Sequence, residues 1–286
     1  MSALAGAVRG PRARSRFRRG TPVGGLIALV VLAVLGAMAL FPALFTGLDP
    51  LSTDVAAILQ PPSWGHVFGT DQVGRDVYTR VVYGAGYSLG VGFGATLIAL
   101  VVGVVLGTLA GLVPRALDGV LMRGVEIVMA FPEFLVALFV IAVLGPGPAN
   151  VIIAVSVAAV PAYIRVARAE TLVVRRAGYV EAAKGLGVHP FWITLRHIIP
   201  NTLAPLSVIA TIGIGTAIVA AAGLSFLGLG PQDPTPEWGL ILSGGRNLLA
   251  VAWWVAVFPG IFITATVIAA TILGRRLRSK SLGGPR

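Results

Sequence analysis

The sequence predicts an all-α integral membrane protein with about six transmembrane helices. Hydrophobic residues make up 56% of the chain and charged residues only 12%, and the mean hydropathy is +0.90. A soluble domain has roughly a quarter charged residues. One water-soluble core could not bury this much apolar surface, because the area that a core hides is limited by the size of the chain. A bilayer removes that limit, so we expect the few charges to lie between the spans.

Six stretches are long and apolar enough to cross a bilayer, since a transmembrane helix needs about 20 apolar residues. They are residues 23–45, 87–113, 126–144, 151–165, 203–228 and 249–273. The first stretch follows a basic segment, as the apolar part of a signal peptide does. It is longer than that part of a signal peptide, and no small-residue cleavage site follows it, so we predict a retained span.

The links between these stretches separate the positive charges by side. Of the 22 Lys and Arg residues, all but Arg75, Arg80 and Arg246 lie before the first stretch, in the second-to-third and fourth-to-fifth links, or after the sixth. Basic residues favour the cytoplasmic side, so we predict that both termini are cytoplasmic. Because the net charge of +11 is carried by the flanks of spans, it does not indicate nucleic-acid binding.

The predicted organisation therefore has five parts. They are a basic cytoplasmic tail (1–22), the first transmembrane helix (23–45), an extracytoplasmic segment (46–86), a five-helix core with a long inner loop at 166–200 (87–273), and a basic cytoplasmic tail (274–286).

Proline and glycine add two local expectations. Pro231, Pro234 and Pro236 argue against a helix in the outer segment 229–248. In the second stretch, Gly103, Gly107 and Gly111 are four residues apart, which predicts a small-residue face for close helix packing.

The residues that carry most enzyme chemistry are scarce. The chain has no cysteine, which excludes disulfides, thiolate metal sites and a cysteine nucleophile. His66, His189 and His197 share no metal-ligand spacing, so we expect no metal site. The sequence has no Gly-x-x-x-x-Gly-Lys-Ser/Thr phosphate loop. We therefore predict no catalytic residue and no cofactor in this chain, with any ATP hydrolysis on a partner.

The inner loop contains a short predicted helix at residues 180–186. Ala182 and Ala183 are strong helix formers, and Glu181 in the first turn suits the helix dipole. Gly185 and Gly187 weaken and end the helix, and the proline at 190 prevents its continuation. A short helix of small residues fits a groove on another protein.

Three blocks of sequence carry a family resemblance. Glu181, Ala182, Ala183, Gly187 and Pro200 match the Glu-Ala-Ala loop of ATP-binding cassette (ABC) importer permeases. The loop departs from the general pattern at residues 197 and 199, and its ending Arg-His-Ile-Ile-Pro-Asn resembles the dipeptide/oligopeptide branch. Phe-Gly-Thr-Asp-Gln-Val-Gly-Arg-Asp at 68–76 resembles the second permease subunit of the dipeptide/oligopeptide/nickel importer family, as do Leu-Ser-Phe-Leu-Gly-Leu-Gly at 224–230 and Pro-Thr-Pro-Glu-Trp-Gly at 234–239.

The resemblance implies a type I ABC importer permease fold in the bacterial cytoplasmic membrane. It implies a heterodimer with a related second permease subunit, an extracytoplasmic solute-binding protein, and ATPase subunits that bind ATP and Mg²⁺. The inner loop, with Glu181, Ala182, Ala183, Gly185, Gly187 and Pro200, would couple the chain to the ATPase. The implied cargo is a di- or oligopeptide, with nickel or another solute as the alternative.

Two functions of other classes have less support. A self-contained secondary transporter would use paired intramembrane charges and inverted repeats. A membrane enzyme would need a cluster of acids, bases or metal ligands. Neither pattern is visible in the sequence.

Five further residues are candidates for function. Glu133, within the third stretch, would line the pathway or contact another helix or subunit, since an ionisable group at membrane depth usually faces protein or water. Asp71, Arg75, Asp76 and Trp238 are candidates for outer-face contacts with substrate or binding protein. The alternative for the first pair is structural, because Asp71 and Arg75 have the spacing of an ion pair within a helical turn.

Overall fold

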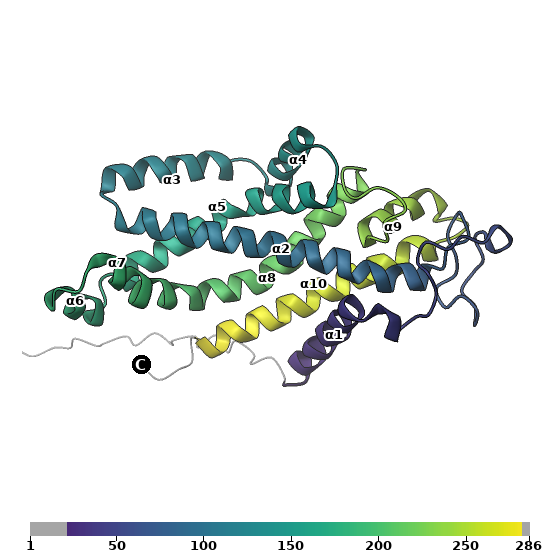
Figure 1. Ribbon diagram of the computed structural model, residues 1–286, viewed down its shortest axis with the longest axis horizontal. Helices are drawn as coiled ribbons and strands as arrows, with labels where there is room; N and C mark the ends of the chain where they lie inside the picture. The colour runs from purple at the N-terminus through teal and green to yellow at the C-terminus, as the bar shows by residue number, and fades with distance from the viewer. Residues whose placement is uncertain (1–21, 282–286) are drawn as a thin grey trace, which may run out of the picture.

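The computed structural model describes residues 22–281, and this part of the chain is helical, without strands (Figure 1). The α-helices are α1 (Pro22–Leu40), α2 (Val77–Leu112), α3 (Arg115–Met129), α4 (Glu133–Leu144), α5 (Pro148–Val174), α6 (Gly178–Gly185), α7 (Pro190–Ile193), α8 (Ile199–Phe226), α9 (Trp238–Gly245) and α10 (Trp254–Ser281). A π-helical segment, η3 (Thr194–Ile198), joins α7 to α8. Three short 3₁₀ turns are η1 (Pro42–Leu44), η2 (Val55–Ala57) and η4 (Arg246–Leu248).

Helices α2 and α5 pack closely through the predicted glycine face. Gly103, Gly107 and Gly111 meet Tyr163, Ala167 and Thr171 of α5, in that order. A Cβ atom at Gly107 would lie only 2.6 Å from that of Ala167, so the contact requires glycine. The prediction of a small-residue packing face is confirmed. Because residue numbers rise together on both sides, α2 and α5 run in the same direction.

Two further long helices, α8 and α10, pack in alternating directions next to α2 and α5. Gly92 and Thr96 of α2 meet Ile218 and Gly213 of α8, so α8 is antiparallel to α2. Helix α10 is antiparallel to α8, since Gly215 meets Val267 and Gly274 meets Ile212.

Helix α1 closes the arrangement beside α10. A side chain at Gly25, near the start of α1, would meet Arg276 near the end of α10, while Gly86 of α2 lies near Ala39 at the end of α1. The start of α1 and the end of α10 therefore lie near each other, on the side of these two helices that faces toward the α6 end of the bundle (Figure 1). The opposite end carries the 41–76 segment and α9 (Figure 1). We call these ends the α6 end and the outer end.

The third predicted span, 126–144, is not one straight helix. Helices α3 and α4 meet at about a right angle (90°), and the break lies at residues 130–132. Pro132 explains it, because proline disfavours a helical conformation at the residue before it and cannot donate a backbone hydrogen bond. Since α2 and α5 run in the same direction, the α3–α4 pair must return the chain to the outer end. Five long helices of the described residues are apolar enough to cross a membrane, and the α3–α4 pair makes a sixth if it crosses as one broken span.

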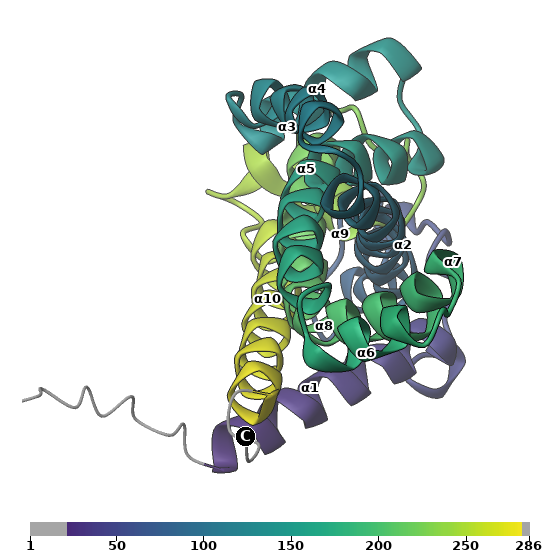
Figure 2. The same cartoon turned by 90° about the vertical axis from the view of Figure 1, so that its left-hand side faces the viewer.

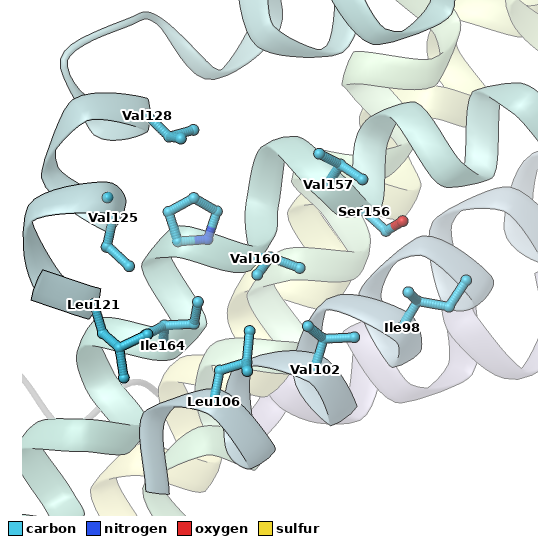
Figure 3. A pocket seen from close by; sticks show the side chains of 12 residues that line it. Ile98, Val102, Leu106, Leu121, Val125, Val128, Ser156, Val157, Val160 and Ile164 are labelled. Atoms are coloured by element: carbon cyan, nitrogen blue, oxygen red, sulfur yellow. The ribbon is translucent and has the colours of Figure 1, made fainter. Parts of the chain in front are cut away.

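Helix α3 stands apart from α2 and α5 along an apolar cleft of about 440 Å³ (Figure 3). The cleft is lined by Ile98, Val102, Leu106, Leu121, Gly124, Val125, Val128, Ser156, Val157, Val160, Pro161 and Ile164. Its one hydroxyl, on Ser156, already donates to the carbonyl of Ile153 over 2.9 Å. The lining therefore suits apolar groups and offers no free catalytic group.

Several predicted boundaries need correction. Helix α2 begins ten residues before the predicted 87, which shortens the extracytoplasmic segment, and α1 ends at Leu40 before Pro42. Helix α5 extends well beyond 165, and α10 continues to Ser281, into the predicted C-terminal tail. The rest of that tail and residues 1–21 lie outside the described residues.

The segment 229–248 does contain a helix. Its prolines all precede Trp238, where α9 begins, and so they do not interrupt it. The prediction against a helix was wrong because proline is tolerated up to the first helical turn.

Candidate functional site

Helix α6 lies at one end of the bundle, where the sequence predicts the coupling loop (Figures 1 and 2). The link is shorter than the predicted 166–200, since α5 reaches Val174 and the chain is helical again from Pro190. Pro200 therefore lies inside a helix, in the first turn of α8, directly after the π-helical segment. Proline has no backbone N–H to donate, and the wider turn of the π-helix before it leaves room for its ring.

Two backbone hydrogen bonds close the C-terminal end of α6. The N–H of Val188 donates to the carbonyl of Ala183 over 3.1 Å, and the N–H of Gly187 donates to that of Lys184 over 3.0 Å. This pair of bonds is a Schellman motif, which places its glycine in the left-handed region. Gly187 has φ of +75°, whereas Gly185 is an ordinary helical residue. Of the two predicted terminators, Gly187 ends the helix.

The two alanines of α6 face opposite ways. Ala183 is 8% exposed and packs with Val180, Ile193 and Ile198 in a small core beneath the helix. Ala182 is exposed. Of the two alanines that the resemblance implies in coupling, Ala182 is therefore the one available for close contact with a partner, whereas Ala183 lies in the chain's own core. Glu181 is also exposed, as a residue available to a partner must be.

Large apolar side chains are exposed around α6. They are Tyr179, Leu186, Phe191, Trp192 and Leu195, and Leu186 is 83% exposed. Sequence reasoning did not identify this group, because each residue alone reads as an ordinary interfacial residue. All five belong to α6, α7, η3 or the residue directly after α6, and we call this group of exposed side chains the α6 surface.

Polar contacts link the helices that lead to α6. Arg175, between α5 and α6, donates to the carbonyl of Gly111 at the end of α2 over 2.6 Å. Arg168 of α5 makes two hydrogen bonds of 2.5 Å to Asp118 of α3. Arg175 therefore connects the start of the α5–α6 link to α2, and Arg168 connects α5 to α3.

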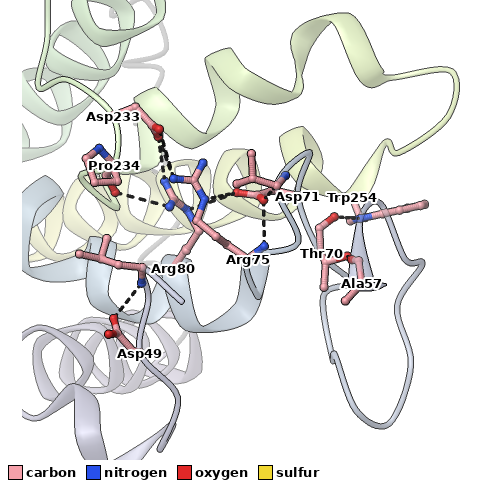
Figure 4. A network of polar contacts seen from close by, with 11 residues as sticks. Asp49, Ala57, Thr70, Asp71, Arg75, Arg80, Asp233, Pro234 and Trp254 are labelled. Atoms are coloured by element: carbon pink, nitrogen blue, oxygen red, sulfur yellow. Dashed lines mark hydrogen bonds and ion pairs between the residues drawn. The ribbon is translucent and has the colours of Figure 1, made fainter. Parts of the chain in front are cut away.

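At the outer end, a buried ionic network joins α2 to the loop before α9 (Figure 4). Arg75 Nε donates to Asp71 over 2.7 Å, and Arg75 Nη1 donates to Asp233 over 3.0 Å. Arg80 is 2% exposed and donates to the carbonyl of Pro234 over 3.4 Å, with both aspartates within 4 Å. The predicted Asp71–Arg75 pair is present, in a turn rather than a helix.

The remaining outer candidates also have structural roles. Asp76 caps α2 by accepting from the N–H of Thr79 over 2.7 Å, and it bonds His66 Nδ1 over 2.9 Å. Trp238 is fully buried and donates its indole N–H to the carbonyl of Val81 over 2.8 Å. Asp71, Arg75, Asp76 and Trp238 were expected as outer-face contacts, and this is corrected: each is buried, so none presents a surface to a partner.

Sequence reasoning missed three members of this region: Arg80, Asp233 and Glu237. Glu237 caps α9 by accepting from the N–H groups of Gly239 and Leu240 over 2.9 and 2.8 Å. Burial raises the pKa of Glu237, and these two hydrogen bonds oppose the rise. Glutamate is not among the preferred N-cap residues, so the local sequence carries little signal for this role of Glu237.

Glu133 lies in the first turn of α4, at the break between α3 and α4, and its side chain is exposed. No other part of the described residues covers the Glu133 side chain. A residue that lines a pathway or contacts another subunit must be uncovered in this way. Its role stays a prediction.

Comparison with known proteins gives three consistent findings. Residues 103–279 match the family described as binding-protein-dependent transport system inner membrane component. The chain is 42% identical over 253 residues to the dipeptide transport system permease protein DppC of Alkalihalophilus pseudofirmus, covering 88% of this chain and 83% of that protein. It is 37% identical over 276 residues to the probable D,D-dipeptide transport system permease protein DdpC of Escherichia coli K12, covering 94% of this chain and 92% of that protein.

A solved structure shows the same fold. An inward-facing structure of the MetNI methionine ABC transporter matches with a TM-score of 0.57 at 21% identity, covering 70% of this chain and 95% of that chain.

Proposed function

Because this chain belongs to the family of binding-protein-dependent transport system inner membrane components, we propose that it is the permease subunit of an ATP-driven importer of small peptides. The membrane-embedded helices and the importer fold support the permease role. The names of its relatives, which concern dipeptides and D,D-dipeptides, support the cargo. The membrane would be the bacterial cytoplasmic membrane.

The importer needs subunits that this chain does not supply. The sequence contains no phosphate loop, so ATP and Mg²⁺ would bind a separate ATPase subunit. A related second permease would complete the pathway, with Glu133 at or near their boundary. An extracytoplasmic solute-binding protein would deliver the peptide.

The observation that carries the coupling role is the α6 surface. Large apolar side chains that the chain's own fold leaves uncovered beyond the ends of its spans fit a protein interface. Helix α6 presents Ala182 at its centre, where a small side chain allows close approach, and Glu181 beside it for a cation of the partner. The contacts of Arg175 and Arg168 then transmit movement of α6 to the spans. We therefore propose that the ATPase subunit docks on this surface.

Substitution of Ala182 tests the docking role. In vesicles containing the complete importer, Ala182→Trp should abolish ATP-dependent uptake and co-purification of the ATPase, because the bulky ring separates the two surfaces. Ala182→Ser is the matched control and should keep both. Ala183→Trp is unsuitable, since Ala183 packs in the chain's own core. Normal uptake by Ala182→Trp would rule out docking at this position.

Uptake measurements test the cargo. Vesicles with the cognate binding protein should accumulate a labelled dipeptide only when ATP is inside and available to the ATPase. Labelled Ni²⁺ offered in the same assay should not accumulate. Accumulation of Ni²⁺ without dipeptide uptake would replace the peptide with the metal as cargo.

A further inference from the structure

Two ionisable side chains of opposite sign lie at the break between α3 and α4. Arg165 of α5 reaches the break, because its Nη2 donates to the thioether sulfur of Met129, the last residue of α3, over 2.9 Å. Glu133 is the first residue of α4, on the other side of the break. The charge of Glu133 acts on Tyr163, which is two residues from Arg165 on α5. The break therefore brings one carboxylate and one guanidinium into the same region.

Neither charge has a counter-ion in the part of the chain that the structure describes. Both side chains are exposed. Neither forms an ion pair within 4 Å, with the other or with a third described residue. The thioether of Met129 is only a weak acceptor for Arg165. Arg168, almost one turn further along α5, differs because Asp118 pairs with it. Glu133 and Arg165 are therefore both available to a ligand.

The two charges lie at membrane depth. Ala167 of α5 meets Gly107 of α2, and the two helices run in the same direction, so Arg165 is level with the turn of α2 before Gly107. That level is about 10 Å inside the end of α2 at Leu112, at a rise of 1.5 Å per residue. Because an uncompensated charge at this depth is costly in lipid, such a group faces protein or water.

Three arguments favour a water-filled path over a packed interface with another subunit. Residues 130–132 are exposed and non-helical, and such backbone at membrane depth is tolerated where it lines a water-filled cavity or is buried in protein. The core of a protein interface is depleted of charged residues, whereas this break presents two. Discontinuous membrane helices also form the substrate sites of secondary transporters. The break therefore has the features of a pathway wall.

We propose that Glu133 and Arg165 are a selectivity site of the translocation path, which recognises a zwitterionic peptide by its two ends. The carboxylate of Glu133 accepts hydrogen bonds from the α-ammonium group of the peptide. The guanidinium of Arg165 donates to the α-carboxylate, a pairing that two parallel hydrogen bonds can make. A divalent cation would be attracted by Glu133 but repelled by Arg165. The inference rests on the proposed function and names the chemistry by which the path selects its cargo.

Peptides with one blocked end test the two contacts separately. Vesicles with the complete importer receive a labelled dipeptide, its N-acetylated form or its C-amidated form, each at a concentration that saturates the binding protein. Glu133→Gln should lower uptake of the free and amidated forms about tenfold, the loss expected for one charge-assisted contact, and leave uptake of the N-acetylated form unchanged. Arg165→Gln should lower uptake of the free and N-acetylated forms and leave that of the amidated form unchanged.

A blocked peptide that the binding protein refuses is tested by its binding to the importer alone in lipid nanodiscs, with the same expected pattern. Glu133→Asp and Arg165→Lys keep the charges and should restore part of the uptake of the free dipeptide. Arg123→Gln is the matched control, because Arg123 is an exposed cation of α3 nearer the α6 end. This control should take up all three peptides normally.

Equal losses for all three peptides would overturn the proposal, because a structural role does not depend on which end of the peptide is blocked. Loss of the second permease subunit from the purified variants would overturn it too, by placing Glu133 and Arg165 at a subunit interface. So would unchanged uptake of the free dipeptide by both glutamine variants. If the unaltered importer takes up no dipeptide in the presence of ATP, the proposed function itself fails, and that result is independent of the variants.

Discussion

Gly187 and Gly185 differ only in backbone conformation, and this difference predicts opposite effects of one substitution. Gly187→Ala forces a Cβ into the left-handed region, which costs about 1–2 kcal/mol. Gly185→Ala adds a methyl group to an open helical position and should stabilise α6 by about 0.5–1 kcal/mol. Amide hydrogen exchange of α6 should be about 5–30-fold faster in the first variant, given that free-energy cost, and slower in the second. Equal exchange in both would contradict the Schellman motif.

Asp71 and Asp233 share the same two arginines but differ in burial. Asp71 is 3% exposed, whereas the side chain of Asp233 is 65% exposed. Loss of one charge from a buried ion pair costs about 3–5 kcal/mol, while an exposed pair contributes about 0–1 kcal/mol. Asp71→Asn should therefore lower the unfolding temperature of the detergent-purified protein much more than Asp233→Asn. A larger effect of Asp233→Asn would mean that the loop before α9, and not Asp71, neutralises the arginines.

At the scale of helices, the close α2–α5 contact requires glycine at Gly103, Gly107 and Gly111. Gly107→Ala would push α5 away from α2, because the new methyl group meets Ala167 and the carbonyl of Ile164. Such overpacking costs about 1–3 kcal/mol. Gly90→Ala on the same helix meets nothing within 4 Å and should be neutral or stabilising. Thermal unfolding of the two variants measures the difference, and similar stability would show that α5 adjusts freely.

The sequence predicts the helices better than it predicts their ends. Apolar length identifies every long helix, and the Gly103 spacing identifies the face on which α2 packs. The start of α2 was misplaced because Tyr83 and the residues before it look like a loop, whereas the cap by Asp76 extends the helix to Val77. Pro132 explains why the helix breaks after α3. The direction in which α4 then continues depends on packing against neighbouring helices, which the local sequence does not reveal.

The candidate sites show a similar division. Residues at the α6 end were identified because the short helix and its terminal glycine are local features. The outer candidates were misassigned because burial is a tertiary property: Trp238 and Arg75 look exposed in a charged, proline-rich sequence but lie in the interior. The partners of Arg75 include Asp233, 158 residues away, and a single sequence does not reveal such a contact.

For the whole molecule, helix directions and charge sorting predict one topology. The contacts of α2, α5, α8 and α10 place α6 at one end and segment 55–70 at the other. Arg75 and Arg80 lie at the outer end with Arg246, whereas the other described Lys and Arg lie toward the α6 end or in α3 and the last turns of α10. Since basic residues favour the cytoplasm, the α6 end should be cytoplasmic.

Reporter fusions test this topology and the broken span together. Fusions after Arg19, which lies outside the described residues, and near Arg176 should report the cytoplasm, while fusions near Pro62 and Pro236 should report the exterior. A fusion at Gly147, between α4 and α5, decides whether the bent α3–α4 pair crosses the membrane. It should report the exterior, because α5 must begin at the outer end to run parallel with α2. A cytoplasmic signal at Gly147 would make the pair a re-entrant loop, and an exterior signal at Arg176 would overturn the whole arrangement.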